Sequence, residues 1–527
     1  MDIDTSVSSV NEDAPAITIN DATSEVQLGL RQSVLKKASE AKVLFSPRAL
    51  ELICSLTQEK ALSVVGKCLE QKVFVITEEL CREVIASIEV IEKAQVIVQF
   101  KSFKPLNAEV ASQLEISEDM DVTGKSRCTG TIEEFVGLFR DRFRRLKGIM
   151  KGRVSELPLI PISGIKGSSR GKTGRIIGIV FDKQTTKNGH VLIELEDEES
   201  SIKCLVMKDS PIREKADDVI LDEVIAIDGS CAEELFIAKD IIWPEVPISP
   251  IKKSADEDVS VICISDIHVG SRLFLKDSFG KFLSFLNGEG TDSEREIAGK
   301  VKYISIAGDL VDGIGVYPDQ EKELATKDIY TQYEILNDYL KLIPEHIEVL
   351  VAPGNHDAVR SAVPQPRLSP EFTKGTAGYK NIHFLGNPVS AKIHGFKHVI
   401  YHGASMYSMI NSLPKLRNTH LNPEKVGVEM LRRRLLNPIY GDNVPFAPEK
   451  RDYTLLEEVP DIFHFGDIHR NGYTSYHGVM VINGGCWQGK TDYQVKLGHE
   501  PTPCQVPIYN LKSNNLQVLN FGGDKII

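Results

Sequence analysis

The sequence lacks long apolar runs and a basic N-terminus. No stretch of its 527 residues approaches the roughly 18 consecutive apolar side chains that cross a membrane. The first residues, Met1 to Ser6, are acidic and polar, which does not match the basic and then apolar layout of a secretory signal peptide. We therefore expect a cytoplasmic protein without membrane contacts.

Cysteine motifs are also missing. The nine cysteines are an odd number, and no two stand in the C-x-x-C spacing of a zinc or redox site. Several lie inside apolar runs, as Cys263 does in Val-Ile-Cys-Ile. Small buried hydrophobic side chains in a reducing compartment explain these thiols better than disulfides do.

Positive charge is in deficit, because the formal net charge is −12. This argues against indiscriminate nucleic-acid binding, although a local basic groove remains compatible with it. Histidine is scarce in the first half of the chain: of 13 histidines, only His190 precedes His268. The C-terminal half is therefore the expected place for metal chemistry.

Composition and hydrophobic periodicity divide the chain into segments and predict a multidomain protein. Five short β segments within about a hundred residues suit a small barrel of the OB type, and alternating strands and helices suit an α/β domain with a two-layered β core flanked by helices. In chain order, the expected segments are a disordered tail (1–27), a small helical domain (28–95), a linker (96–130), a basic amphipathic helix (131–148), the OB-type barrel (149–245), a second linker (246–258) and the α/β domain (259–527).

The segment 131–148 combines an apolar stripe with a cluster of cations. The stripe follows helical spacing and consists of Ile132, Phe135, Val136, Phe139, Phe143 and Leu146. The cations are Arg140, Arg142, Arg144, Arg145 and Lys147. One interpretation is a docked helix with a solvated basic face. The other is an edge that contacts phosphates or a partner.

Five apolar segments of the C-terminal domain each end in a glycine or tight turn with polar side chains at the tip. These tips carry Asp266 and His268, Asp309, Asn355 and His356, His402, and Asp467 and His469. A continuous apolar run is typical of a buried central strand, and sites in open α/β sheets form at the carboxyl ends of strands. Residues two apart project from the same side of an extended chain, so Asp266 and His268 can converge on one ion.

A pocket that gathers these carboxylates needs a cation. Each motif alone has an ordinary explanation; the Gly-Asn-His-Asp sequence at 354–357, for example, fits a turn because Gly and Asn tolerate positive φ. Like charges about 4 Å apart, however, repel by roughly 4 kcal/mol at an effective dielectric of about 20. Together, the tips therefore predict a metal site.

The ordered set D-x-H, G-D, G-N-H, H-G and G-x-x-H resembles the calcineurin-like metallophosphoesterase superfamily. Three longer stretches, residues 122–130, 354–366 and 431–440, resemble more narrowly the family of small, exonuclease subunits of archaeal DNA polymerase D. The resemblance extends over roughly residues 30 to 525, and the order of helical region, OB barrel and phosphoesterase domain also fits it.

The resemblance implies two divalent ions, with manganese or magnesium expected first and iron or zinc as alternatives. It assigns Asp266, His268, Asp309 and His469 to one ion, and Asp309, Asn355, His402 and Asp467 to the other. His356 would be the acid that protonates the leaving oxygen, with Asp357 orienting it. Nuclease relatives commonly carry His where this chain has Asp467, so the metal preference is expected to differ; the alternative is a partly impaired site. Nearby His464 is a candidate substitute ligand, although its place on the strand before the glycine is more typical of a structural role.

The same resemblance implies a 3′–5′ DNA exonuclease that proofreads. It also implies the large catalytic subunit of the polymerase as partner, DNA with a primer 3′ end as substrate, and a sliding clamp as a further partner. The candidate DNA or partner contacts are Arg140, Arg144, Arg145, Lys147 and Arg360. The alternative is a catalytically silent scaffold. A protein phosphatase is disfavoured, because those relatives read G-D-x-V-D-R-G and G-N-H-E, whereas Gly313 and Asp357 stand at the differing positions here.

Overall fold

The computed structural model describes residues 31–41, 43–56, 58–70, 75–82, 84–85, 103–153, 156–165, 169–249, 252–417 and 421–523. The expected disordered tail lies outside these residues. The chain divides into two compact units, Met1–Phe103 and Lys104–Ile527. None of the helices in the described part of the chain is long and apolar enough to span a bilayer.

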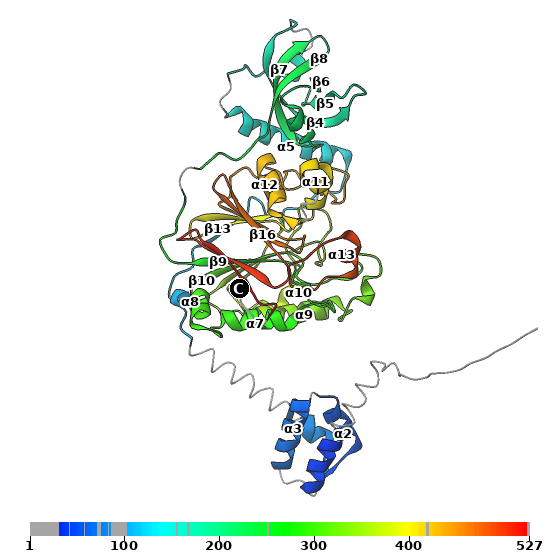
Figure 1. Ribbon diagram of the computed structural model, residues 1–527, viewed down its shortest axis with the longest axis vertical. Coiled ribbons are helices and arrows are strands. Elements are labelled where there is room, and N and C mark those ends of the chain that lie inside the picture. Colours follow the sequence, from blue (N-terminus) through cyan, green and yellow to red (C-terminus); the bar gives the residue numbers. More distant parts are fainter. Residues whose placement is uncertain are drawn as a thin grey trace, which may run out of the picture. The chain divides into compact units, whose positions relative to one another are not determined.

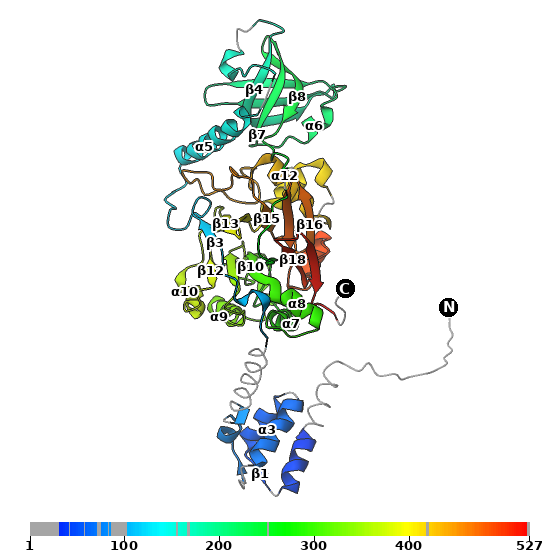
Figure 2. The same ribbon diagram turned by 90° about the vertical axis from the view of Figure 1, so that its left-hand side faces the viewer.

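The first unit is a small helical body, drawn in blue in Figures 1 and 2. Helix α2 (Pro47–Cys54) begins after Ser46, whose side chain caps it by accepting a hydrogen bond from the amide of Ala49. It is followed by α3 (Gln58–Glu70), and two short strands, β1 (Leu44–Phe45) and β2 (Val75–Ile76), pair in parallel. Buried apolar side chains of these helices form its core.

The second unit contains a small barrel. Its strands are β4 (Thr173–Thr185), β5 (Val191–Glu196), β6 (Ser201–Val206), β7 (Val224–Ala232) and β8 (Leu235–Ile242), and they close in the order β4-β5-β6-β8-β7. Alternate residues of β5 are buried, which is the period-two pattern of a strand with one face on a core. The short helix α6 (Arg213–Asp217) connects β6 to β7.

The rest of the second unit is built on two six-stranded sheets. The first has the order β12-β11-β10-β9-β18-β19, with strands β9 (Ser260–Ile264), β10 (Val301–Ala307), β11 (Glu348–Ala352), β12 (Ile382–Phe384), β18 (Gln505–Asn510) and β19 (Leu516–Asn520). The second has the order β16-β17-β15-β14-β13-β3, with strands β3 (Leu114–Ser117), β13 (Val389–Ile393), β14 (Phe396–Ile400), β15 (Ile462–Phe465), β16 (Asn471–Tyr476) and β17 (Val479–Gly484). Strand β3 lies in the stretch expected to be a linker, yet it pairs with β13 at the sheet edge.

The two sheets face each other across a shared core, and helices cover their outer faces. Val261 and Tyr303 of the first sheet belong to the same apolar cluster as Ile400 and Ile482 of the second. In Figure 1, α7 (Lys276–Leu286), α8 (Asp292–Lys300), α9 (Ile329–Leu340) and α10 (Pro370–Thr373) lie on the side of the first sheet. The other helices are α11 (Met406–Ser412), α12 (Glu424–Arg433) and α13 (Asp492–Leu497).

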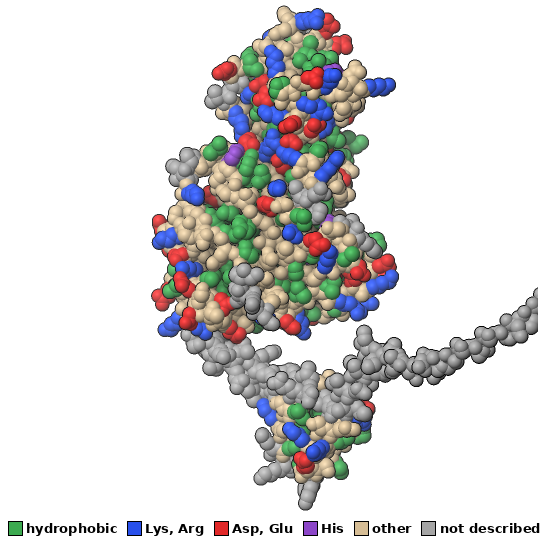
Figure 3. Space-filling model, in the orientation of Figure 1, with side chains coloured by type: hydrophobic (Ala, Val, Ile, Leu, Met, Phe, Trp, Pro, Cys, Tyr) green, Lys and Arg blue, Asp and Glu red, His purple; other side chains and the backbone are tan. Residues whose placement is uncertain are grey.

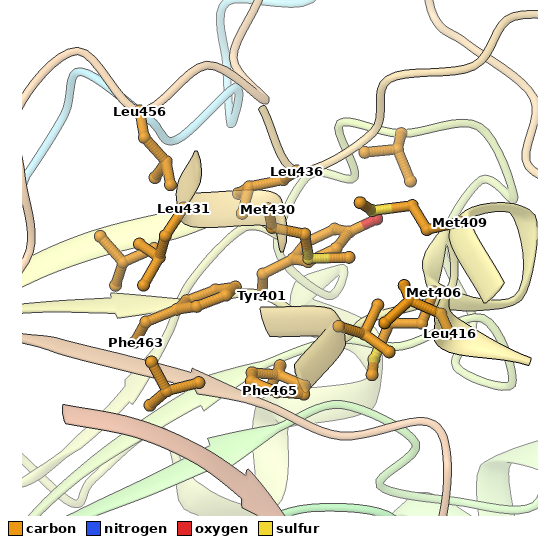
Figure 4. Close-up of a cluster of buried hydrophobic side chains, with 14 of the residues drawn as sticks. Tyr401, Met406, Met409, Leu416, Met430, Leu431, Leu436, Leu456, Phe463 and Phe465 are labelled. Carbon is orange, nitrogen blue, oxygen red and sulfur yellow. The ribbon is translucent and has the colours of Figure 1, made fainter. Parts of the chain in front are cut away.

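A second cluster holds α11 and α12 against the second sheet (Figure 4). Met406 and Met409 of α11 and Met430 of α12 pack with Phe463 and Phe465 of β15. These side chains are fully buried, and burial of a residue of this size contributes roughly 1.5–3 kcal/mol. The end of β15 is thereby fixed on both faces of its sheet.

Helix α5 (Ile132–Lys151) covers the stretch expected to be the basic amphipathic helix. It starts with a capping box, in which Thr131 and Glu134 exchange side-chain to backbone hydrogen bonds. Buried Arg142 reaches Asp452 at 2.7 Å and donates to the carbonyl oxygens of Asn437 and Pro438 at 3.0 and 2.7 Å. These contacts dock the helix against the part of the unit that is built on the two sheets.

Two of the other cations on α5 are also paired within the chain. Arg144 contacts Glu198 at 2.6 Å, and Arg145 contacts Glu457 at 2.8 Å. This pattern favours the interpretation of α5 as a docked helix, with Arg140 and Lys147 left on its surface. On the face seen in Figure 3, acidic and basic side chains are interspersed.

Two buried histidines lie in the space between the sheets. His464 on β15 shares a hydrogen bond of 2.7 Å with the hydroxyl of Ser305, and His398 on β14 has no hydrogen-bond partner for either ring nitrogen among the described residues. Burial lowers the pKa of His398 to about 3, from an ordinary value of 6.5. A neutral His398 is therefore part of the folded state.

We predict that replacing Arg142 with Met lowers the free energy of unfolding by about 3–5 kcal/mol, because it leaves the Asp452 carboxylate buried without its counter-charge. Urea denaturation of the full chain measures this change. The matched control is Arg140→Met on the exposed face of the same helix, with an expected change within about 0.5 kcal/mol. Equal midpoints for the two variants would contradict the prediction.

We predict that His398→Leu stabilises the protein by about 1–3 kcal/mol, because it removes two buried nitrogens that lack partners. The pKa of His398 is lower in the folded state than in the unfolded state. The free energy of unfolding of the wild type is therefore independent of this titration above about pH 6.5, and it decreases as the pH falls from there toward 3. Wild-type stability should fall by about 1 kcal/mol more per pH unit than that of the variant in this window. Urea denaturation of both proteins in the presence of a chelator at pH 7.5 and pH 5 measures the difference in stability and its dependence on pH. An equal loss of stability in the two proteins between these pH values would contradict the expected pH dependence.

Candidate metal centre

The polar tips of five strands meet at one edge of the paired sheets. Strands β9, β10 and β11 of the first sheet lead to Asp266 and His268, to Asp309, and to Asn355 and His356. Strands β14 and β15 of the second sheet lead to His402 and to Asp467 and His469. The parallel pairings β10–β9, β10–β11 and β14–β15 place these ends side by side.

One group of side chains gathers around Asp266. Its Oδ1 lies 3.4 Å from Nε2 of His469 and 4.0 Å from Nε2 of His268. The two ring nitrogens lie 3.0 Å apart. One carboxylate oxygen and two imidazole nitrogens therefore converge within the span of a single cation.

A second group gathers around His402. Its Nε2 lies 2.8 Å from Oδ1 of Asn355, 3.3 Å from Oδ1 of Asp309 and 3.5 Å from Oδ1 of Asp467. The other oxygen of Asp467 is buried and has no hydrogen-bond partner among the described residues. An oxygen left in this state costs about 1–3 kcal/mol unless a cation or proton satisfies it.

Asp309 lies between the two groups. Its Oδ1 faces His402, whereas its Oδ2 lies 3.8 Å from Nε2 of His268 and 3.8 Å from Nε2 of His356. Each oxygen thus points toward a different group. This is the arrangement that a carboxylate needs in order to bridge two ions.

Backbone geometry at these tips is strained. Asp266, His268, Asp309, Asp467 and His469 all adopt positive φ between 49° and 70°, where non-glycine residues cost about 1–3 kcal/mol each. Two backbone hydrogen bonds hold the first two loops: the amide of Asp266 donates to Gly308 at 2.9 Å, and that of His268 donates to Asp309 at 3.0 Å. Strain concentrated on the candidate ligands is typical of a functional site.

Close packing against the tips requires glycine at two positions. A Cβ on Gly354 would lie 2.1 Å from Oδ1 of Asp309, and a Cβ on Gly466 would lie 2.5 Å from Oδ2 of Asp266. The glycines in the G-N-H and G-x-x-H motifs therefore make room for the carboxylates of neighbouring strands.

A layer of polar side chains orients the imidazoles. Nδ1 of His268 lies 3.0 Å from Oδ1 of Asp312, and Nδ1 of His402 lies 2.8 Å from the carbonyl oxygen of Ala307. Gln488 in turn donates to Asp312 at 3.0 Å. Such partners fix the ring so that Nε2 faces the site. Sequence reasoning did not assign roles to Asp312 or Gln488, although Asp312 follows Asp309 by three residues in the same motif.

His356 lies at the wall of the site. Its Nδ1 lies 2.8 Å from the carbonyl oxygen of Asp312, so the ring is oriented by this backbone group. Asp357, expected to orient His356, has other contacts: it accepts from the amides of Gly354 at 2.8 Å and Leu310 at 3.2 Å. Asp357 therefore shapes the turn that presents Asn355 and His356.

Buried charges perturb one another strongly. Burial opposes ionisation of Asp309, yet its pKa lies well below the ordinary value because His402 and His356 stand beside it. Burial also opposes protonation of His402 and His469, yet the pKa of each lies well above 6.5, because Asp309 faces the first and Asp266 the second. The pocket therefore favours positive charge at its centre.

A cavity of about 720 Å³ opens over these groups. The candidate ligands His268, Asp309, Asn355, Asp467 and His469 line its floor together with His356. Tyr317, Tyr407 and His499 contribute aromatic rings to the lining. Oxygen and imidazole donors, a buried carboxylate oxygen without a partner and an open cavity all fit divalent cations.

The other candidate contacts lie apart from this floor. Arg360 contacts Glu449 at 3.0 Å and donates to the hydroxyl of Ser126 at 2.7 Å, which ties two loops together. Arg144 and Arg145 are paired as described above. His464, considered as a substitute ligand, lies in the core between the sheets.

Comparison with known proteins agrees with this architecture. Residues 261–474 match the family of B subunits of DNA polymerases alpha and epsilon. A DNA polymerase II small subunit from Methanocaldococcus jannaschii is 43% identical over 407 residues, which are 76% of this chain and 68% of that protein. One from Archaeoglobus fulgidus is 36% identical over 493 residues, which are 93% and 98% of the two chains.

A solved structure of an archaeal phosphodiesterase aligns with 51% of this chain and 100% of its own, at 12% identity and a TM-score of 0.26, a likeness too weak to carry an argument. The two small subunits are each similar to this chain over most of their length. The chain therefore belongs to the family of archaeal DNA polymerase II (polymerase D) small subunits.

Proposed function

We propose that this polymerase small subunit is a two-metal 3′–5′ DNA exonuclease that proofreads for a large catalytic subunit. The observation that carries the proposal is the position of Asp309, whose two oxygens face two separate groups of ligands. A carboxylate in that position has little structural use without two cations. The similarity to DNA polymerase II small subunits supports the role as a polymerase subunit.

The donor set divides between two ions. Asp266, His268, Asp309 and His469 would hold the first, and Asp309, Asn355, His402 and Asp467 the second. The mixture of carboxylate, amide and imidazole donors suits manganese first, with magnesium, iron and zinc as alternatives. When bound, a pair of ions supplies an activated water and offsets charge on the phosphate.

The residues of the chain supply positioning and proton transfer. Nδ1 of His356 donates to the Asp312 carbonyl, so Nε2 can give a proton to the leaving oxygen when the ring carries a proton on both nitrogens. The flat rings of Tyr407 and His499, stacked with centroids 5.4 Å apart, offer a surface for a nucleobase. Each feature lies on the cavity above the ligands.

The surrounding architecture fits the same proposal. The barrel order β4-β5-β6-β8-β7 is that of an OB barrel, and the two sheets with ligands at their strand ends suit a metallophosphoesterase domain. Arg140 and Lys147 remain candidates for DNA contacts. A purely scaffolding subunit is the second candidate, favoured by the departure from histidine at Asp467.

We expect His356→Ala to slow manganese-dependent digestion of a mismatched primer by about 100- to 10,000-fold, because it removes the proton donor and leaves the ligands in place. Asp309→Ala should abolish digestion and also reduce bound metal, as measured by mass spectrometry of the purified chain. The control is His383→Ala, a histidine on β12 that contacts Glu348 at 2.7 Å outside the cavity. Normal digestion by both site variants would refute the proposed nuclease activity. If the wild-type complex digests no primer, the scaffolding subunit becomes the favoured function.

We expect Asp467→His to shift the metal preference toward zinc over manganese on the order of tenfold, because imidazole is a softer ligand than carboxylate. Competition titration calorimetry measures the ratio of the two affinities. Asp467→Asn, which keeps the shape but loses the charge, should instead weaken both metals. An unchanged preference in the His variant would place Asp467 outside the second ion's ligands.

A further inference from the structure

An open apolar groove lies between α5, β4 and Tyr440, away from the metal cavity. It has a volume of about 440 Å³. Ile132 is 78% exposed, Phe181 is 61% exposed, Tyr440 is 49% exposed and Val136 is 42% exposed. The N-terminal half of the apolar stripe on α5, which a docked helix should bury, is therefore on the surface.

The floor of the groove is aromatic. Phe135 and Phe139 of α5 both contact Tyr440, with ring centroids 5.1 and 5.7 Å apart. Their backbone is held firmly, because the next turns of α5 carry the buried Arg142–Asp452 pair. A rigid concave surface of large apolar side chains is typical of a site for a partner's anchor residues.

Acidic side chains line the same groove. Glu196, Asp197, Glu198 and Asp222 belong to its wall, whereas Arg140 is its one lining cation among the described residues. Glu198 pairs with Arg144, and Asp222 accepts from the amide of Tyr440 at 2.8 Å. Glu196 makes no ion pair within the described part of the chain, and burial together with nearby Asp222 raises its pKa.

We propose that this groove receives a basic amphipathic segment of the large polymerase subunit. Apolar side chains of that segment fill the space over Phe135, Phe139 and Phe181, and a Lys or Arg pairs with Glu196 and Asp222. The acidic wall repels phosphates, so DNA is the wrong occupant. The volume suits a few anchor side chains of one helix or strand, as in helix-in-groove recognition.

The proposal rests on the subunit role but not on the nuclease chemistry. The test is co-purification of the full-length chain with the large subunit of the same organism, followed by titration of the purified partners. We expect Phe181→Asp and Ile132→Asp each to weaken the affinity at least tenfold. The matched control is Leu342→Asp, a 50% exposed leucine just after α9, which should bind as the wild type does.

Charge gives a second measurement. Glu196→Lys should weaken binding more than Glu196→Gln, and the difference should shrink in high salt, because an exposed ion pair is screened. Melting temperatures of all variants, each within a few degrees of the wild type, confirm that the fold is retained. Asp309→Ala should lose digestion but still bind the large subunit, which separates this proposal from the nuclease.

The groove proposal is overturned if both groove variants with wild-type melting bind the large subunit normally. It is also overturned if gel filtration shows a homodimer that the same substitutions break, since a second copy of the chain is then the occupant. Loss of binding in the control variant Leu342→Asp would equally overturn it, because the effect would not be specific to the groove.

Discussion

Three carboxylates, those of Asp266, Asp309 and Asp467, are held close together at the metal cavity, two of them fully buried, and this electrostatic constraint accounts for much of the surrounding structure. Like charges in such a place separate unless the chain prevents it. The buried strands, the tight glycine contacts and the positive-φ backbone at the tips all serve to prevent it. The multivalent cations proposed for this site would offset their combined cost.

The two sheets share this task unequally. The first sheet supplies both carboxylates of its central strands and the Asn355–His356 turn, whereas the second supplies His402 and the Asp467–His469 loop. The imidazoles are oriented by backbone carbonyls and by Asp312, which are themselves fixed by their strands. The packing of the sheets therefore sets the positions of the ligands more than any local loop preference does.

The sequence predicted the strand tips because buried central strands read as continuous apolar runs, and a charged residue directly after such a run is unusual. It did not predict the roles of Asp312 and Gln488, which lie 176 residues apart and meet only when the sheets are assembled. It also placed β3 in a linker, because a four-residue edge strand with half-exposed side chains has no periodic signal. The sequence alone is compatible with one basic face on α5. Only the fold shows that Asp452 pairs with Arg142 and that Glu457 pairs with Arg145.

The division of ligands between facing sheets has a consequence for how this protein tolerates change. Any sliding of one sheet past the other changes the distances within both groups, because His469 of the second sheet faces Asp266 of the first, and His402 of the second sheet faces Asn355 of the first. Substitutions in the shared core, such as at Tyr303 or Ile400, would therefore change the distances between the candidate metal ligands well before they unfold the chain. The interior of the sandwich therefore helps to set the geometry of the proposed metal centre.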